Sequence, residues 1–85
     1  MRLIRTDRFA HDYARLPARV QKQTDRKVRC LARNITHPSL RVKRVQKYRH
    51  VYEGSINMDY RFLFLVTEDA YVLLRIGRHD MLERL

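Results

Sequence analysis

Two apolar runs near the C-terminal end, residues 60–66 and 71–76, constrain the fold more than any other segment. In the first run aromatic and aliphatic side chains alternate with the period of two that a β-strand has. The second run is rich in strand-forming residues and follows a short polar link, 67–70, so the pair predicts a β-hairpin. Arg61 and Arg75 interrupt the two runs. Each must reach water, a carboxylate or a phosphate, because unpaired buried charge is costly.

Helical periodicity comes before these strands. Residues 7–16 and about 18–35 each carry an apolar stripe at helical spacing, and Pro17 separates them. The opposite stripe of the second helix is basic: Arg19, Lys22, Arg26, Arg29 and Arg33. A connection this short predicts a helix hairpin whose apolar sides face a common core.

Shorter strands are expected at residues 2–5, 40–45 and 51–56, and one helical turn at 80–85. The sequence therefore predicts an α+β fold, in which an N-terminal helix hairpin packs on one face of a small, mainly antiparallel sheet of four to five strands. The other face of that sheet is expected to be half open. Length predicts that residues 1–85 form a single domain.

Net charge points to a polyanionic or acidic partner, with nucleic acid the leading class. The chain carries 19 Lys and Arg against 9 Asp and Glu, a formal charge of +10. Its one cysteine, Cys30, cannot form an intramolecular disulfide, and the sequence has neither an apolar signal region nor a membrane-spanning run. A soluble, cytoplasmic protein is expected.

Metal and nucleophile chemistry find little support in the sequence. The histidines are scattered without the pairwise spacing of a zinc site: His11, His37, His50 and His79. Ser39 and Ser55 lie in no nucleophile motif, and Cys30 falls on a predicted helix, where packing is its usual role. We therefore expect no metal and no cofactor, which leaves cations and one histidine near a strand end.

Three segments together resemble the RelE/ParE toxin superfamily of toxin–antitoxin systems. They are Asn57-Met-Asp-Tyr-Arg-Phe-Leu-Phe, then Val72-Leu-Leu-Arg-Ile-Gly-Arg-His79, and upstream His37-Pro-Ser-Leu-Arg-Val42 after a helix hairpin. The resemblance covers essentially the whole chain. For the RelE branch it implies metal-independent cleavage of mRNA in the ribosomal A site, and a co-encoded acidic antitoxin that holds the toxin in check.

The resemblance implies a role for each candidate site residue. Arg61 matches the family's phosphate-contacting arginine, and His79 matches a position where some members carry a catalytic histidine. Glu53 is a candidate base. RNA contacts are expected from the basic residues Arg41, Lys43, Arg44, Lys47, Arg49, Arg75 and Arg78.

Two departures keep other interpretations open. Gly54 and Ser55 stand on the strand where RelE has catalytic lysines, and no tyrosine near the C-terminus matches the one that stacks on the substrate base. One alternative is a ParE-like inhibitor of DNA gyrase without RNase activity, and another is a plain nucleic-acid-binding module. In a purely structural alternative, Arg61 pairs with Asp59 or Glu53 and His79 caps a strand end.

Overall fold

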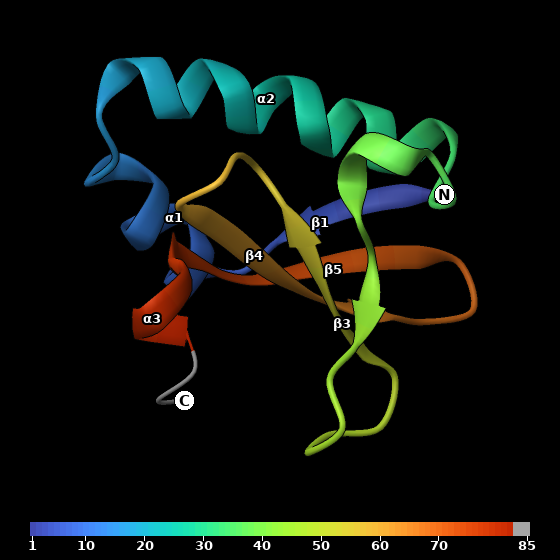
Figure 1. The fold of residues 1–85 in the computed structure, drawn as a ribbon. Coiled ribbons are helices and arrows are strands. Elements are labelled where there is room, and N and C mark those ends of the chain that lie inside the picture. Colours follow the sequence, from blue (N-terminus) through green and yellow to red (C-terminus); the bar gives the residue numbers. More distant parts are fainter. Residues whose placement is uncertain (83–85) are drawn as a thin grey trace.

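A five-stranded mixed sheet with three helices makes up the computed structural model, which describes residues 1–82 (Figure 1). The elements in chain order are β1 (Arg2–Arg5), α1 (Asp7–Ala14), α2 (Ala18–Arg33), the 3-10 turn η1 (Pro38–Leu40), β2 (Lys43–Arg44), β3 (Val51–Ser55), β4 (Tyr60–Val66), β5 (Ala70–Arg78) and α3 (His79–Leu82).

The strand order in the sheet is β1-β5-β4-β3-β2. Strands β2 to β5 pair as successive antiparallel neighbours, whereas β1 pairs with β5 in parallel. The first and last strands therefore lie side by side, with both helices of the N-terminal hairpin in the connection that follows β1. This arrangement confirms the predicted α+β class and the mainly antiparallel sheet.

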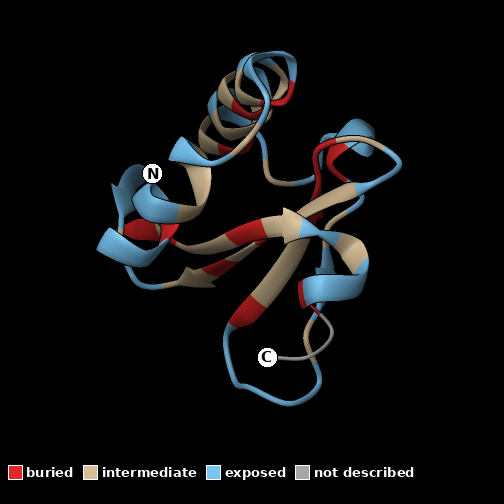
Figure 2. Ribbon diagram, turned by 90° about the vertical axis from the view of Figure 1, so that its left-hand side faces the viewer, coloured by how far each residue is buried: buried red, intermediate tan, exposed pale blue. Residues whose placement is uncertain are grey.

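Helix α2 lies across one face of the sheet, and the core fills the space between them (Figures 1 and 2). The α2 side chains Val20, Thr24 and Leu31 are buried, as the predicted apolar stripe requires. Val20 and Leu31 belong to the same buried cluster as the rings of Phe62 and Phe64, which are stacked with their centroids 5.5 Å apart. Burial of large apolar and aromatic side chains is the main stabilising contribution in a domain of this size.

Helix α1 adds Phe9 to this core and begins at a capped N-terminus. The Phe9 amide donates to Thr6 Oγ1 at 3.1 Å, and Thr6 Oγ1 in turn donates to the Leu73 carbonyl of β5 at 2.8 Å. The threonine therefore caps the helix and ties its first turn to the sheet.

Several predicted boundaries differ from the structure. The strand expected at 40–45 is reduced to Lys43–Arg44, because η1 occupies Pro38–Leu40 and Arg41 then takes a left-handed conformation with φ 46°. Helix α2 stops at Arg33, since Asn34 is extended. The last strand runs to Arg78, and helix α3 begins at His79; residues 83–85 of the expected C-terminal turn lie outside the described part of the chain.

A register shift between β4 and β5 decides which side chains face the open side of the sheet. Leu63 pairs with Arg75 and Phe64 with Leu73, so Leu74 is an extra residue on β5. Leu73 and Ile76 are both buried in the core despite their odd separation. The bulge therefore turns Arg75 to the face of the sheet away from α2.

Candidate functional site

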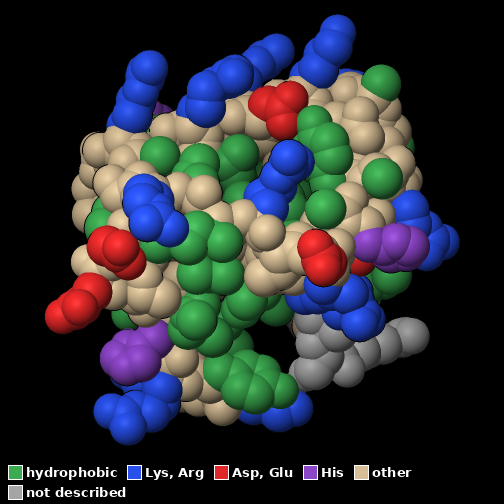
Figure 3. All heavy atoms as spheres, turned by 180° about the vertical axis from the view of Figure 1, so that it is seen from behind, with side chains coloured by type: hydrophobic (Ala, Val, Ile, Leu, Met, Phe, Trp, Pro, Cys, Tyr) green, Lys and Arg blue, Asp and Glu red, His purple; other side chains and the backbone are tan. Residues whose placement is uncertain are grey.

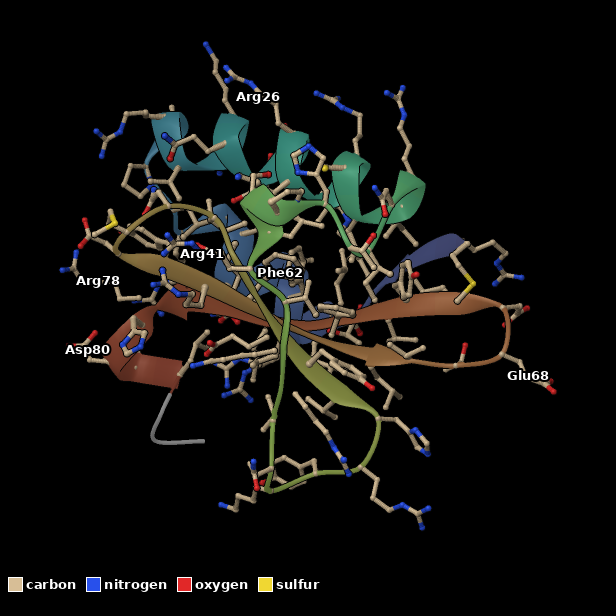
Figure 4. All side chains as sticks on the ribbon, turned by 45° about the vertical axis from the view of Figure 1, so that its right-hand side comes forward. Arg26, Arg41, Phe62, Glu68, Arg78 and Asp80 are labelled. Carbon is tan, nitrogen blue, oxygen red and sulfur yellow. The ribbon has the colours of Figure 1, made fainter. Side chains whose placement is uncertain are left out.

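A polar hollow at one end of the sheet brings together the two residues that the sequence singles out, Arg61 and His79. Its lining consists of Met58, Asp59, Arg61, Arg78, His79 and Asp80. The hollow forms where β4 begins, β5 ends and α3 starts. Figure 4 shows Arg78 and Asp80 at this end of the sheet, with Glu68 of the β4–β5 turn at the opposite end.

Strand register positions Arg61 in this hollow. Arg61 pairs with Ser55 on β3 and with Gly77 on β5, so its two neighbours across the sheet have small side chains. Gly77 has no side chain, and Leu82 of α3 packs over this position of the sheet. A Cβ on residue 77 would lie 3.9 Å from Leu82 Cδ2. The guanidinium consequently has room beside α3.

The Arg61 guanidinium binds backbone carbonyls instead of a carboxylate. Its Nη1 donates to the carbonyl oxygens of Asn57, Met58 and Tyr60 in the β3–β4 turn. Among residues 1–82 Arg61 makes no ion pair, so the structure does not have the pairing with Asp59 or Glu53 that the purely structural alternative requires. Its positive charge is thus held in place by the turn without being neutralised there.

The β3–β4 turn that holds Arg61 is itself fixed from two sides. The Asn57 side chain accepts from the amides of Asp59 and Tyr60 at 2.8 and 3.0 Å. Its Nδ2 donates to Gln23 Oε1 of α2 at 2.7 Å. An Asx-type turn anchored to a helix gives the arginine a rigid support.

His79 follows directly after β5 and is the first residue of α3. Its backbone amide donates to the Asp59 carbonyl at 2.8 Å, which joins the start of α3 to the β3–β4 turn. The buried side chain of Leu82 holds α3 against the sheet. The imidazole and the Arg61 guanidinium therefore line one hollow although 18 positions separate them in the sequence.

Glu53 lies on the same face of the sheet as Arg61 but does not pair with it. The partner of Arg61 on β3 is Ser55, and Glu53 is two residues before Ser55. Its carboxylate pairs with Lys43 at 3.3 Å, and its side chain is 13% exposed. Glu53 does not line the hollow. The carboxylates that do line it belong to Asp59 and Asp80, which the sequence analysis did not name as candidates for proton transfer although they flank Tyr60-Arg61 and His79.

Arg75 is occupied by a carboxylate from α1. Its Nε donates to Asp12 Oδ2 at 2.7 Å, and its Nη2 lies 3.4 Å from Asp12 Oδ1. The same Oδ2 accepts from the Ile76 amide at 3.2 Å. With side-chain exposures of 21% and 12%, this pair ties α1 to β5, and we do not include Arg75 in the RNA-binding surface.

The basic turn between β2 and β3 lies at the far end of the sheet from the hollow. The His50 carbonyl accepts from the Val66 amide at 2.9 Å, so the turn with Lys47 and Arg49 adjoins the last residue of β4. Arg61 is five residues earlier on that strand, which corresponds to about 17 Å. The structure therefore separates these cations from Arg61 and His79.

An apolar hollow adjoins the same basic turn. Its lining consists of Tyr48, Arg49, Val51, Leu63, Leu74 and Arg75. Seen from behind, hydrophobic side chains cover much of the middle of the molecule, while basic side chains project from the upper edge, where α2 lies (Figure 3). The sheet face away from α2 thus has an apolar hollow with Arg49 and Arg75 in its lining.

Two of the remaining candidates lie apart from both hollows. Arg44 pairs with Tyr52, one position along from the Lys43–Glu53 pair, so it alternates to the α2 side of the sheet. Arg41 lines a depression beside η1 together with His37, Pro38 and Val42. Of the predicted RNA-binding residues, only Arg78 shares the hollow with Arg61 and His79.

Within residues 1–82, no three His, Cys, Asp or Glu side chains come together in a way that would hold a metal ion. No helix in the same part of the chain has the length and apolar character needed to cross a membrane. The ionisable side chains that line the Arg61 hollow belong to Arg61, Arg78, His79, Asp59 and Asp80.

No protein-family model matches the sequence, and no curated protein matches it either. The fold, in contrast, has solved counterparts. A YoeB/ParE toxin from Agrobacterium tumefaciens superposes with a TM-score of 0.79 at 18% identity, covering 93% of this chain and 99% of that one. YafQ from E. coli gives 0.80 at 14% identity, with 96% and 98% covered.

A third solved counterpart is the RelB–RelE antitoxin–toxin complex from Methanococcus jannaschii, with a TM-score of 0.80 at 14% identity and 95% of both chains covered. Near-complete coverage in each case means that the whole architecture is shared, not one supersecondary motif. The resemblance that the sequence predicts is therefore confirmed at the level of the fold.

Proposed function

We propose, on the premise that this chain has the fold of the RelE/ParE toxins, that it is the toxin of a toxin–antitoxin pair and cleaves mRNA on the ribosome without a metal. The observation that carries the proposal is the hollow in which an arginine without a carboxylate partner and a histidine meet. Fold alone does not carry it, since one fold can host several functions.

RNA cleavage without a metal needs three kinds of group. A base takes the proton of the 2′-hydroxyl, cations stabilise the charge that develops on the phosphorus centre, and an acid protonates the 5′-oxygen as it leaves. The products are a cyclic phosphate and a 5′-hydroxyl, so atoms and protons balance without a cofactor. The residues of the hollow can be assigned to these three tasks.

We assign phosphate stabilisation to Arg61. Its Nη1 is bound by turn carbonyls, and the N–H groups on Nε and Nη2 remain for two phosphate oxygens. Because the turn already holds the guanidinium, little conformational freedom is lost when substrate binds. Arg78, exposed beside it, adds a second cation.

We assign proton transfer to His79, because an imidazole can both accept and donate a proton. A second proton-transfer group is needed, and the aspartates of the hollow, Asp59 and Asp80, support that role better than Glu53, because Glu53 is paired with Lys43 outside the hollow. Glu53 stays a prediction for this role.

Controlled expression without a partner tests the proposal. We expect growth arrest and, by primer extension on a translated message, new 5′ ends within codons soon after induction. Supercoiling of a reporter plasmid should stay unchanged in the same cells. The matched control is the Arg61→Ala variant, which should give neither arrest nor new ends. Altered supercoiling with intact message would overturn the nuclease proposal.

One observation favours the gyrase-inhibitor alternative. The β3 positions nearest Arg61 are Ser55, which is buried and donates to the Asn57 carbonyl at 3.2 Å, and Gly54, which faces the core. Neither can supply a cation to the hollow, which leaves fewer charges around a bound phosphate than the RelE pattern has. The supercoiling measurement decides between these two functions.

The partner we propose is an acidic antitoxin that covers the sheet face away from α2. Attraction to a chain of net charge +10 would act at long range. Once docked, the antitoxin could bury the apolar hollow formed by Val51, Leu63 and Leu74. A segment on this face would also reach the Arg61 hollow and exclude RNA from it.

A further inference from the structure

Helix α2 carries a line of basic side chains on its outer face, away from the sheet and from the Arg61 hollow. Its members, all exposed, are Arg19, Lys22, Arg26, Arg29 and Arg33. Figure 4 shows Arg26 projecting outward from the helix, and the same upper edge carries basic side chains in Figure 3. We call this line the α2 stripe.

Among the described residues, none of the five cations has an acidic partner. Three ion pairs occur within residues 1–82, and all three lie outside α2. The one acidic residue of the helix, Asp25, turns toward α1 and accepts a 2.8 Å hydrogen bond from the Tyr13 hydroxyl. Like charges three and four residues apart destabilise a helix by about 0.2–0.5 kcal/mol per pair. The stripe thus weakens α2, and a bound polyanion would remove that repulsion.

Geometry narrows the kind of polyanion. Arg19 and Arg33 are 14 residues apart, so the stripe is about 21 Å long, with a cation about every 5 Å. Its C-terminal half is hollowed, with the guanidinium-bearing residues Arg26, Arg29 and Arg33 around a depression that His37 also lines. Cations at this regular spacing beside a depression can contact successive phosphates of a nucleic-acid backbone.

The composition of α2 also excludes one mode of nucleic-acid recognition. The helix has no aromatic residue, so it offers no platform on which unpaired bases could stack. Long cationic side chains with no stacking partner contact the backbone and carry little sequence information. The stripe is therefore suited to a double helix, whose bases are already stacked and whose phosphates line the surface.

We propose that the α2 stripe binds the phosphate backbone of double-helical RNA, independently of the strand that enters the Arg61 hollow. The choice of RNA over DNA rests on the proposed function, whereas the phosphate contact does not. Since α2 lies on the other face of the sheet from Glu53 and Leu63, a partner covering that face would leave the stripe accessible. Two anionic ligands could then be held at once.

Binding of a 20-base-pair RNA duplex, measured by fluorescence anisotropy between 50 and 300 mM KCl, tests this proposal. All proteins carry Arg61→Ala, so cleavage does not interfere and failure of the nuclease proposal leaves the result readable. The test variant is Arg26→Gln/Arg29→Gln/Arg33→Gln. If each cation neutralises one phosphate, the plot of log association constant against log salt concentration should be less steep for the test variant, by about 2.7, than for the protein with Arg61→Ala alone.

The matched control is Arg2→Gln/Arg5→Gln/Arg8→Gln, which removes the same charge from exposed positions outside α2. We expect it to change the slope by less than one third of the change in the test variant. Equal changes in both variants would mean that only total charge matters and would overturn the proposal. Tighter binding of a DNA duplex than of the RNA duplex would overturn the choice of RNA. Thermal melting of each variant confirms that it is folded.

Discussion

At the scale of single residues, Arg61 and Arg75 are alike in sequence and different in structure. Each interrupts an apolar run, but Arg61 binds only turn carbonyls, whereas Arg75 is paired with Asp12. The carboxylate for Arg75 lies 63 positions earlier on another element, so no local pattern could have predicted it. The carbonyls for Arg61 come from its own turn. The strand pattern located both arginines, but it predicted neither the turn carbonyls that bind Arg61 nor the carboxylate that binds Arg75.

Separate roles for cations in the hollow and in the basic turn lead to our first prediction. Arg61→Ala should lower RNA cleavage by about 10²-fold or more by removing charge stabilisation from the transition state. Ribosome affinity should be largely kept, because many other cations share the phosphate attraction. Single-turnover cleavage and ribosome pelleting measure the two properties separately.

Lys47→Ala/Arg49→Ala is the comparison variant, since these residues lie about 17 Å along β4 from Arg61. It should weaken ribosome binding and flatten its salt dependence, and cleavage of bound message should persist. The division of roles is wrong if both variants lose affinity equally.

At the scale of elements, the patterns of period two and 3.6 located most strands and both long helices. The predicted strand at 60–66 coincides with β4, because its alternation reflects one covered face and one more open face. The bulge at Leu74 was not predictable, since an unbroken apolar run hides an extra residue. Parallel pairing of β1 with β5 was not predictable either, because it joins residues about 68 positions apart.

The two glycines near the site provide a matched pair for the second prediction. A Cβ at Gly54 would lie 2.5 Å from Cε1 and Cζ of Phe62, whose ring is fully buried. Gly54→Ala should therefore lower the free energy of unfolding by about 1–3 kcal/mol through overpacking. A Cβ at Gly77 meets only Leu82 Cδ2 at 3.9 Å, an ordinary contact.

Gly77→Ala should consequently leave stability unchanged or raise it by up to about 1 kcal/mol, since alanine restricts the unfolded chain. Urea unfolding of the two variants beside the original protein measures the difference. A Gly54→Ala variant as stable as Gly77→Ala would contradict the packing of Phe62 against β3.

The contact between α1 and α2 gives the third prediction. The hydrogen bond from the Tyr13 hydroxyl to Asp25 raises the pKa of Tyr13, burial and the negative charge of Asp25 raise it further, and Arg5 opposes them. The folded state thus holds the phenol proton more firmly than the unfolded chain. The stabilisation is fully present below about pH 10, the ordinary tyrosine value, and is lost as pH rises through the raised pKa.

Tyr13→Phe should lower the free energy of unfolding by about 1 kcal/mol at pH 8, the usual contribution of one hydrogen bond. Denaturant unfolding between pH 8 and 11 should show the gap to the original protein closing above pH 10. Tyr48→Phe, at a residue that is 47% exposed, is the control and should not alter the pH profile. A gap that stays constant across this range would contradict a raised Tyr13 pKa.

At the scale of the whole molecule, the sequence predicted the fold class because charge and apolar periodicity divide the chain clearly. The N-terminal half carries apolar stripes at helical spacing and the C-terminal half carries strands. Few architectures bury the apolar side chains of both halves. The distribution of the cations was less predictable: Arg44 and Lys43 are neighbours in sequence but alternate between faces, and Arg49 lies far from Arg61. Folding therefore separates a seemingly continuous basic segment into several surfaces.

This separation leads to the last prediction, which concerns the proposed antitoxin. The sheet face away from α2 offers an apolar hollow with Arg49 at its margin and continues to the Arg61 hollow, whereas the α2 stripe lies on the other side. An acidic segment that folds on this face gains apolar burial and charge attraction together, at an ordering cost of about 2–5 kcal/mol.

The product of an adjacent gene encoding a short acidic protein should therefore co-purify with the chain. Hydrogen exchange on mixing should slow at the β3–β4 turn, 56–60, and in α3, where short elements open readily in the free protein. Helix residues 8–33 should exchange as before. Protection confined to those helices would place the antitoxin on α2, leave the Arg61 hollow open and rule out inhibition by covering it.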